Sequence, residues 1–412
     1  MTDVETLGRD AAAWVAAHWR PDLSVGEWWA LLAAEGFSHP TLPEHAGGRG
    51  TNRAGNAAVR RAIADAGAMG PPTGLGMMLA APTIAAHGSQ EQIDRLVRPI
   101  LDGSQAWCQL FSEPNAGSDL ASLQTSAIRD GDEYVVNGQK VWTSGGKIAD
   151  MGMLIARTDP TLPKHAGIAW FAFDMHQPGV DVRPLTEMTG RAIFNEVFID
   201  DARVLASDLI GEDGNGWRVA NDTLLFERMS LGANPVPLKS CTPGTVANNL
   251  DKRAGDIAAR QRSGEDGVPQ PNLSLWERLV ERARENGKIN DPVVRDELIR
   301  FYQLAEVNRL TAMRGRAKGA SPATPNIGKL MMSELYHSAR ELGSLILGLD
   351  AVMADHSGLE SAIQEMVMFS PGPAIYGGTD QIQRNIIGER ALGLPREPGP
   401  AKETPFSELP KN

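Results

Sequence analysis

The spacing of apolar residues divides the chain into three parts. Over residues 6–103 apolar side chains recur at helical intervals, and this pattern predicts helices. Beyond Trp107, short apolar runs alternate with the turn pairs Asp130-Gly131 and Asn137-Gly138, which predict hairpins between strands. The helical interval returns at Trp217 and continues to about residue 392. The pattern therefore predicts a helical part, a β part and a second helical part.

These changes of pattern set the expected domain boundaries. We predict an N-terminal helical domain at residues 1–104, a middle β domain at 105–215 and a helical bundle at 216–397. The expected fold class is mainly α with a central β domain. Residues 234–272 hold five prolines and are expected to form a loop-rich insertion, in which the run at 260–267 is expected to be an exposed loop. Residues 398–412 are expected to form a flexible tail.

The composition excludes some classes of binding partner and indicates a cellular compartment. Lys and Arg number 40 against 51 Asp and Glu, a net charge of −11, and a chain this acidic with no basic stripe is repelled by nucleic acid. The longest uncharged stretch, residues 69–86, is interrupted by three prolines and is too short to span a membrane. Two cysteines cannot form a secreted disulfide framework, and the first residues do not read as a signal peptide. We expect a cytoplasmic protein without nucleic-acid or membrane partners.

Common metal and nucleotide motifs are missing from the sequence. The eight histidines include no pair at i, i+4 spacing, and there is no Cys/His cluster, so we expect no metal site. The GxG at Gly74 and Gly76 lacks a third glycine and follows no predicted strand, which argues against a Rossmann fingerprint.

Three runs of small and polar residues stand out instead. They are QLFSEPNAGSD at 109–119, NGQKVWTSGG at 137–146 and YGGTDQIQR at 376–384. Any one of them alone could be a surface loop, since Gly, Asn, Ser and Pro serve turn chemistry. Together, in this order and at these positions relative to the predicted domains, they point to a shared site.

With LPEHAGG at 42–48 and AHGSQEQ at 86–92, these runs resemble the acyl-CoA dehydrogenase family over nearly the whole chain. The resemblance implies an N-terminal α domain, a middle β-barrel-like domain and a C-terminal four-helix bundle, with FAD bound across a subunit interface. It also implies an acyl-CoA substrate and an electron-transfer flavoprotein as electron acceptor. The assembly would be a homo-oligomer, or a heterotetramer with a homologous subunit as in the actinobacterial steroid acyl-CoA dehydrogenases that the chain faintly resembles.

The resemblance also implies which residues hold FAD. Trp142 would pack against the isoalloxazine ring, and the Ser144 hydroxyl would meet flavin N5, where the family usually has Thr. An alternative for Trp142 is a strand tryptophan packed inside the sheet. The further residues implied to bind the cofactor are Phe111 and Ser112 on the pyrimidine side, Ser118 near the pyrophosphate and the substrate, Thr143, and Thr379 and Gln381 from a bundle helix.

The catalytic base is expected on a helix. Many family members carry a Glu directly after the Tyr of the third run, but here that position is Gly377, which has no side chain to accept a proton. Glu227 lies on a largely apolar helix face, where burial would raise its pKa. Glu227-Arg228 resembles the Glu-Arg pair of members whose base lies on this helix. We predict Glu227 as base, Arg228 beside the substrate and the Gly377 N–H on the thioester oxygen; a capped or ion-paired structural Glu227 is the alternative.

Two departures from the family pattern concern the adenine half of FAD. The family's Arg-x-x-Phe-Gly appears only as RARENG at 282–287, and LGLDAV at 347–352 replaces the glycine-rich stretch before the third run. A homologous subunit that completes the site would explain both departures. Two alternative functions stay open: a non-catalytic, site-completing subunit, and a flavin oxidase or monooxygenase on the same fold.

Overall fold

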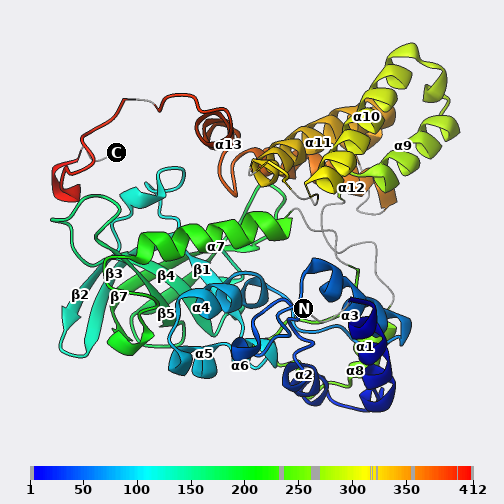
Figure 1. The fold of residues 1–412 in the computed structure, drawn as a ribbon. Coiled ribbons are helices and arrows are strands. Elements are labelled where there is room, and N and C mark those ends of the chain that lie inside the picture. The colour runs from blue at the N-terminus through cyan, green and yellow to red at the C-terminus, as the bar shows by residue number, and fades with distance from the viewer. Residues whose placement is uncertain are drawn as a thin grey trace.

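Three groups of elements follow one another along the chain in the computed structural model (Figure 1). The structure describes residues 4–231, 236–260, 270–315, 317, 319–321, 323–353, 358–396 and 398–409. A helical group comes first, a sheet follows, and a helical bundle extends away from both. The predicted fold class, mainly α with a central β domain, is confirmed.

The N-terminal helices pack around two tryptophans. They are α1 (Val4–His18), α2 (Val25–Ala34), α3 (Arg53–Asp65), α4 (Ala81–His87), α5 (Gln90–Leu96) and α6 (Arg98–Leu101). Trp28 and Trp29 are fully buried, and their indole N–H groups donate to the carbonyl oxygens of Met69 (2.7 Å) and Gly70 (2.9 Å). Because a buried indole needs a partner for its N–H, these bonds fix the segment after α3 against α2.

The middle domain is one curled sheet of seven strands. They are β1 (Trp107–Leu110), β2 (Ser126–Asp130), β3 (Glu133–Ser144), β4 (Met151–Arg157), β5 (Ile168–Asp174), β6 (Val180–Leu185) and β7 (Phe194–Leu205). Their order is β1-β4-β2-β3-β7-β6, and β5 pairs with β4. The predicted hairpin at Asp130-Gly131 is present between β2 and β3. The turn predicted at Asn137-Gly138 is wrong, because this pair lies inside β3 at a register shift in its pairing with β7. β4 and β5 are covered on both faces, which explains why their apolar runs are nearly continuous.

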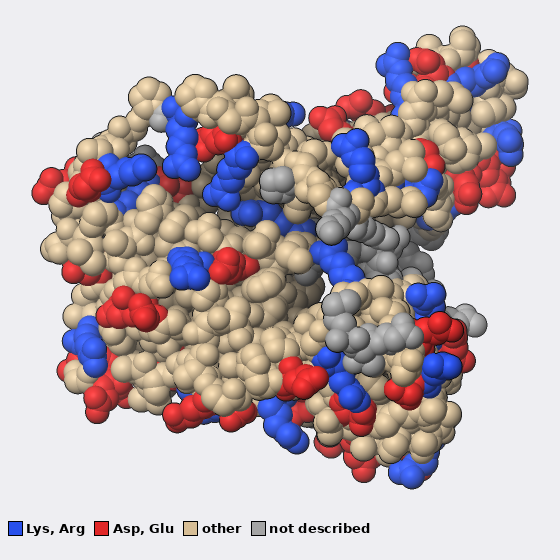
Figure 2. All heavy atoms as spheres, viewed as in Figure 1, with Lys and Arg blue, Asp and Glu red and all other residues tan. Residues whose placement is uncertain are grey.

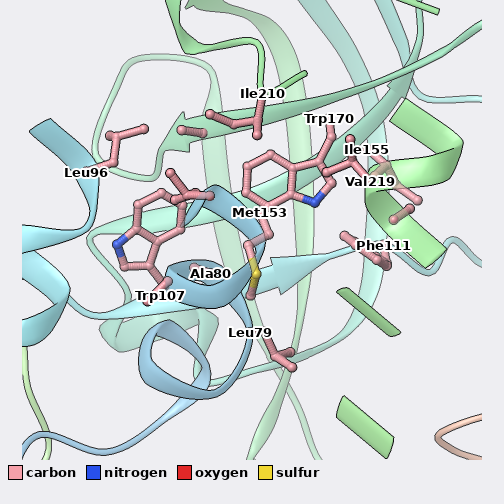
Figure 3. Close-up of a cluster of buried hydrophobic side chains, with 14 of the residues drawn as sticks. Leu79, Ala80, Leu96, Trp107, Phe111, Met153, Ile155, Trp170, Ile210 and Val219 are labelled. Atoms are coloured by element: carbon pink, nitrogen blue, oxygen red, sulfur yellow. The ribbon is translucent and has the colours of Figure 1, made fainter. Parts of the chain in front are cut away.

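Helix α7 (Gly216–Leu231) joins the sheet to the rest of the molecule. Its residue Val219 meets Ile155 of β4 and Trp170 of β5 in one buried cluster (Figure 3). A five-residue π-helix, Gly76–Ala80, contributes Leu79 and Ala80 to the same cluster. This packing positions α7, and therefore Glu227, against both the sheet and the N-terminal helices.

The C-terminal helices form the bundle that Figure 1 shows extending away from the sheet. They are α9 (Leu273–Glu285), α10 (Pro292–Arg314), α11 (Thr324–Leu347), α12 (Gly358–Phe369) and the short α13 (Asp380–Ile386). The first four enclose a core of their own, with Phe301, Leu342 and Ile363 at its centre. Within the described ranges, no helix is both long and apolar enough to cross a membrane, and no group of acidic, His and Cys side chains could hold a metal ion.

The insertion between α7 and α9 packs against the N-terminal helices over residues 236–260. The N–H groups of Val25 and Gly26 donate to the carbonyl oxygens of Lys252 (2.8 Å) and Leu250 (2.9 Å). A short helix, α8 (Ala254–Ala259), adds two buried side chains to the N-terminal core. Residues 236–253 form no helix or strand element, and their contacts with the N-terminal helices leave no pattern in the sequence because they join segments far apart in the chain. Residues 234–235 and 261–269 of the predicted insertion lie outside the described residues.

The predicted flexible tail is anchored near its end. The Phe406 N–H donates to the Leu162 carbonyl oxygen (2.9 Å), and the Phe406 ring lies 3.5 Å from the Arg157 guanidinium. This cation–π contact holds the segment against the loop between β4 and β5. These contacts of Phe406 join segments far apart in the chain and could not be read from composition, while the flexibility of the tail stays a prediction. Residues 410–412 lie outside the described residues.

Candidate active site

Trp142 is turned outward from its strand by a β-bulge. The pairing of β3 with β7 shifts register between Lys140 and Thr143, and Trp142 adopts a positive φ of 59° there. Its indole is 58% exposed and meets only the edge of Phe194, at 5.8 Å between ring centroids. Bulges re-aim side chains, often next to active sites. Trp142 is therefore not packed inside the sheet, and its ring face is free to stack on a ligand.

The neighbours of Trp142 on β3 divide between the two sides of the strand. Ser144 is exposed on the same side as Trp142. Thr143 is fully buried, and its hydroxyl has no hydrogen-bond partner among the described residues. The Thr143 side chain consequently faces away from any ligand on Trp142, and a cofactor contact at this position would involve the backbone.

The first polar run, residues 109–119, lies beside β3. The Phe111 side chain is only 4% exposed and packs near Ile155 and Val219 (Figure 3), so it faces the core. Ser112 is half-buried, and its carbonyl oxygen accepts from the Val141 N–H (2.9 Å), which joins the run to β3. Ser118 is exposed further along the run. Of these predicted ligands, Phe111 could reach a cofactor only through its backbone.

A buried ion pair that sequence reasoning missed supports the same run. Lys140 is fully buried, and its Nζ lies 2.8 Å from Glu113 Oε1 and 3.1 Å from the Phe111 carbonyl oxygen. Glu113 also accepts from the N–H groups of Gln124 (2.6 Å) and Thr125 (2.9 Å). Burial raises the pKa of Glu113, but the Lys140 charge and these bonds outweigh burial and hold it below its ordinary value. The sequence around Lys140, with Asn137 and Gln139 before it and Thr143 and Ser144 after it, is largely polar, so no pattern there marks Lys140 as buried.

Glu227 lies on α7 near residues of the first and the third polar run. Burial raises its pKa, while the neighbouring Arg228 charge and a hydrogen bond with Gln109 of the first run act in the opposite direction. Burial also raises the pKa of Tyr376, and the charges of Tyr336 and Glu227 raise it further. Glu227 is therefore close to both the first and the third run.

The third run forms a glycine turn and the start of α13. Gly377 and Gly378 have φ values of 64° and 83°, a backbone conformation that favours glycine. The Thr379 hydroxyl accepts from the Ile382 N–H (3.2 Å) and so caps α13, which leaves its own hydrogen free to donate. Gln381 is exposed on the first turn of that helix.

Arg228 lies among other charges at the end of α7. Burial lowers its pKa, Glu227 raises it, and the positive charge of Arg390 lowers it again. Figure 2 shows basic side chains gathered along the hollow between the bundle and the rest of the molecule. Such a hollow suits a ligand that carries phosphates.

The residues around Trp142 fit one half of FAD, the cofactor that the resemblance implies. An exposed ring beside an exposed Ser144 hydroxyl offers a stacking surface and a hydrogen-bond donor. Arg282, at the place of the family's Arg-x-x-Phe-Gly, does not fit the phosphate half. It is paired with Glu360 (2.9 Å), Glu285 (3.4 Å) and Asp350 (3.5 Å), three carboxylates that occupy the guanidinium a phosphate would need.

Comparisons with known proteins agree along the chain. Three family models match in order: the acyl-CoA dehydrogenase N-terminal domain over residues 4–104, the middle domain over 108–202 and the C-terminal domain over 273–392. The acyl-CoA dehydrogenase IpdE1 of Mycobacterium tuberculosis is 37% identical over 373 residues, 90% of this chain and 88% of the relative. The mitochondrial isovaleryl-CoA dehydrogenase of Bos taurus is 31% identical over 217 residues, 52% of this chain and 51% of the relative.

Two solved structures are similar over almost the full length. The Tcur3481-Tcur3483 steroid ACAD has a TM-score of 0.70 and 25% identity, covering 96% of this chain and 98% of that one. The ChsE4-ChsE5 complex from Mycobacterium tuberculosis has a TM-score of 0.68 and 28% identity, covering 96% and 99%. With three domain models in order and a relative of this identity, the chain belongs to the acyl-CoA dehydrogenase family of FAD-dependent oxidoreductases.

Proposed function

We propose that this enzyme oxidises an acyl-CoA thioester to its α,β-unsaturated product, with Glu227 as the base. The α C–H bond breaks and its proton goes to the Glu227 carboxylate, while the β hydrogen leaves with its electron pair. FAD supplies the two-electron acceptor for that hydride, at N5. The observation that carries the proposal is a half-buried carboxylate beside the glycine turn, at a site where the turn itself offers no carboxylate.

The surroundings of Glu227 suit a general base. A carboxylate at its ordinary pKa is too weak to remove an α proton efficiently, and burial strengthens it by raising the pKa. Arg228 and Gln109 oppose burial and so favour the ionised form that the reaction needs. The net effect is a pKa raised above that of an exposed glutamate, which makes Glu227 a stronger base.

The other residues orient the reactants. Trp142 and Ser144 would hold the flavin ring, Ser112, Thr379 and Gln381 would bind further parts of the cofactor, and Ser118 and Arg228 would lie near the CoA thioester. The Gly377 N–H would donate to the thioester oxygen, where negative charge develops as the α proton leaves. A fixed donor at that position lowers the barrier in the same way as an oxyanion hole.

A partner subunit would complete the cofactor site. Arg282 is neutralised by its three carboxylates and cannot serve a phosphate. Two of the similar solved structures are named as pairs of chains, Tcur3481-Tcur3483 and ChsE4-ChsE5. These observations support a hetero-oligomer with a homologous subunit. They also support a second candidate function, in which this chain only completes the partner's site; Glu227 favours the catalytic role.

The proposed substrate is a branched or steroid-derived acyl-CoA, the substrate classes in the names of the similar proteins. Electrons would pass to an electron-transfer flavoprotein.

The test is anaerobic reduction of the bound flavin. The chain, produced alone and with a homologous subunit, is mixed with isovaleryl-CoA, cyclohexane-1-carbonyl-CoA or a steroid side-chain acyl-CoA, and the visible flavin absorbance is followed. We expect bleaching by at least one substrate, one unsaturated product per flavin, and reoxidation by electron-transfer flavoprotein that outpaces reoxidation by air. Rapid reoxidation by air would indicate an oxidase instead, and an assembly that binds flavin but never bleaches would indicate a non-catalytic subunit.

A further inference from the structure

The glycine turn at 377–378 carries two N–H groups without a hydrogen-bond acceptor among the described residues. On its N-terminal side, the Tyr376 N–H donates to the Gly372 carbonyl oxygen at 3.0 Å. In the part of the chain that the structure describes, neither the Gly377 nor the Gly378 N–H has a protein acceptor. Two consecutive glycines would leave this backbone free to rotate. Something outside the turn must therefore hold it if its N–H groups are to serve a ligand.

Gln383 holds the other side of the turn. Its side chain is fully buried, and its Nε2 donates to the Gly377 carbonyl oxygen at 2.7 Å and approaches the Gly378 carbonyl oxygen at 3.5 Å. The approach needs glycine at 378, because a Cβ there would lie 2.7 Å from that same Nε2. Since a peptide unit is planar, the fixed Gly377 carbonyl also fixes the Gly378 N–H. The preceding unit, which carries the Gly377 N–H, is held between this anchor and the bond from the Tyr376 N–H to Gly372.

Asn326 determines which way the Gln383 amide faces. The Asn326 Nδ2, 5% exposed on α11, donates to Gln383 Oε1 at 2.6 Å. An amide whose oxygen is held on one side must present its NH₂ group on the other. Asn326 thus directs the donor end of Gln383 toward the Gly377 carbonyl oxygen.

The same face of α11 fixes the helix that carries Gln383. Lys329 Nζ lies 3.0 Å and Ser333 Oγ 2.8 Å from Asp380 Oδ1, at the start of α13. Lys329 and Ser333 are both almost completely buried. Asn326, Lys329 and Ser333 are spaced at i, i+3 and i+7. Their polar side chains therefore lie on one face of α11, next to the turn and the start of α13.

We propose that Gln383, oriented by Asn326, is a positioning residue. It holds the 377–378 turn so that the Gly377 N–H can donate a hydrogen bond to the thioester oxygen. The role rests on the proposed function and adds to it. Where the family often has a glutamate, this chain has a more flexible glycine, and the buried amide restores the order that an oxyanion donor requires.

The test distinguishes the loss of the hydrogen bond from Gln383 to the Gly377 carbonyl oxygen from a general loss of protein stability. Gln383→Glu keeps the shape and the bond from Asn326 but cannot donate to the Gly377 carbonyl oxygen. Asn326→Asp is the second variant, because it removes the donor that orients the amide without placing a charge at 383. Asn385→Asp, an exposed amide-to-acid change on α13, is the matched control. The substrate is whichever of the three acyl-CoAs bleaches the unmodified enzyme fastest.

Two readouts are used on the flavin-loaded assembly. We expect Gln383→Glu and Asn326→Asp to lower kcat about 10- to 100-fold, less than the roughly 100- to 1,000-fold loss of an oxyanion donor itself, with little change in KM. In a Glu227→Gln background, where the thioester stays intact, isotope-edited infrared spectroscopy of the carbon-13-labelled carbonyl reports its polarisation. We expect its frequency to move back toward the value in water in either variant, and to stay shifted in Asn385→Asp.

The outcomes also separate this inference from the function on which it rests. A carbonyl that is polarised in the Glu227→Gln protein and stays so after Gln383→Glu and Asn326→Asp would overturn the positioning role alone. A bound thioester that is not polarised even in the Glu227→Gln protein would overturn the Gly377 site as well. An assembly that binds none of the three acyl-CoAs would overturn the proposed function and this inference with it.

Discussion

At the scale of single residues, the site depends on one carboxylate, Glu227, whose pKa is set by opposing influences of burial and of its neighbours. Burial raises the pKa of Glu227, and Arg228 and Gln109 limit the rise. Gly377 has a φ of 64°, which a side-chain-bearing residue adopts only with strain. A base on α7 therefore avoids placing a glutamate in a left-handed turn.

The opposing influences on the pKa of Glu227 predict that Arg228→Gln changes the pH dependence of flavin bleaching. Removing the positive charge removes an influence that lowers the pKa of Glu227, so that pKa rises. Because the base acts only when deprotonated, the acidic limb of the pH profile for flavin bleaching should move to higher pH. Stopped-flow rates over a pH series measure the limb. Arg218→Gln, exposed on the same helix, is the control and should leave the limb in place; an Arg228→Gln limb that stays or moves to lower pH would contradict the assignment.

At the scale of elements, the buried pair joins the first polar run to β3. Lys140→Met would leave the Glu113 charge buried without its partner, which costs about 3–5 kcal/mol of unfolding free energy. Urea unfolding at neutral pH measures the loss. Adding Glu113→Gln should recover part of it, and a double variant no more stable than Lys140→Met would argue against a direct pair.

The same pair has a defined pH dependence. The pKa of Glu113 is held below its ordinary 4.5, so the stabilisation is present above that pH and is lost as the pH falls through the lower, folded-state value. The difference in stability between the unmodified chain and Glu113→Gln should accordingly shrink in acid.

Gly244 is where the insertion meets the sheet, and Gly244→Ala tests that contact. Thr245 donates to the buried Asp150 there, Gly244 has a φ of 94°, and a Cβ at 244 would lie 2.5 Å from Asp150 Oδ2. We expect a loss of unfolding free energy larger than that of Gly67→Ala, where φ is 61° but no atom lies within 4 Å. Urea midpoints compare the two. Equal losses would mean that only backbone strain matters and that the insertion is not tightly docked.

The sequence allowed prediction of features that depend on local pattern. The hairpin at Asp130-Gly131 and the helix that carries Glu227 follow from turn residues and from apolar spacing. The docked insertion and the anchored Phe406 could not be predicted, because their bonds join backbone groups or rings far apart in the chain. The outward turn of Trp142 depends on a one-residue register shift, which side-chain pattern does not encode.

At the scale of the whole molecule, the bundle carries an exposed apolar stripe along α10. Ile299, Tyr302, Leu310 and Met313 lie along one side of α10 and are 40–54% exposed. Exposed apolar surface of this kind marks a protein interface. Together with the ion pairs of Arg282, it supports the proposal that a partner subunit completes the cofactor site.

We therefore predict that the chain sediments as a dimer or larger assembly and holds a full complement of FAD only with a homologous subunit. Leu310→Glu should weaken assembly and release flavin together, because it charges the stripe. Val293→Glu, exposed on another side of α10, is the control. Analytical ultracentrifugation with flavin absorbance follows both quantities, and a stable, flavin-loaded monomer at micromolar concentration would contradict the prediction.

The measurement that tests the central claim most directly is the rate of anaerobic flavin bleaching in Glu227→Gln. The substitution keeps the shape of the side chain but removes its ability to accept a proton. If Glu227 is the base, the rate should fall at least about 100-fold, while FAD and the acyl-CoA still bind. Bleaching at the unmodified rate would show that the proton goes elsewhere and that Glu227 is a structural carboxylate of α7.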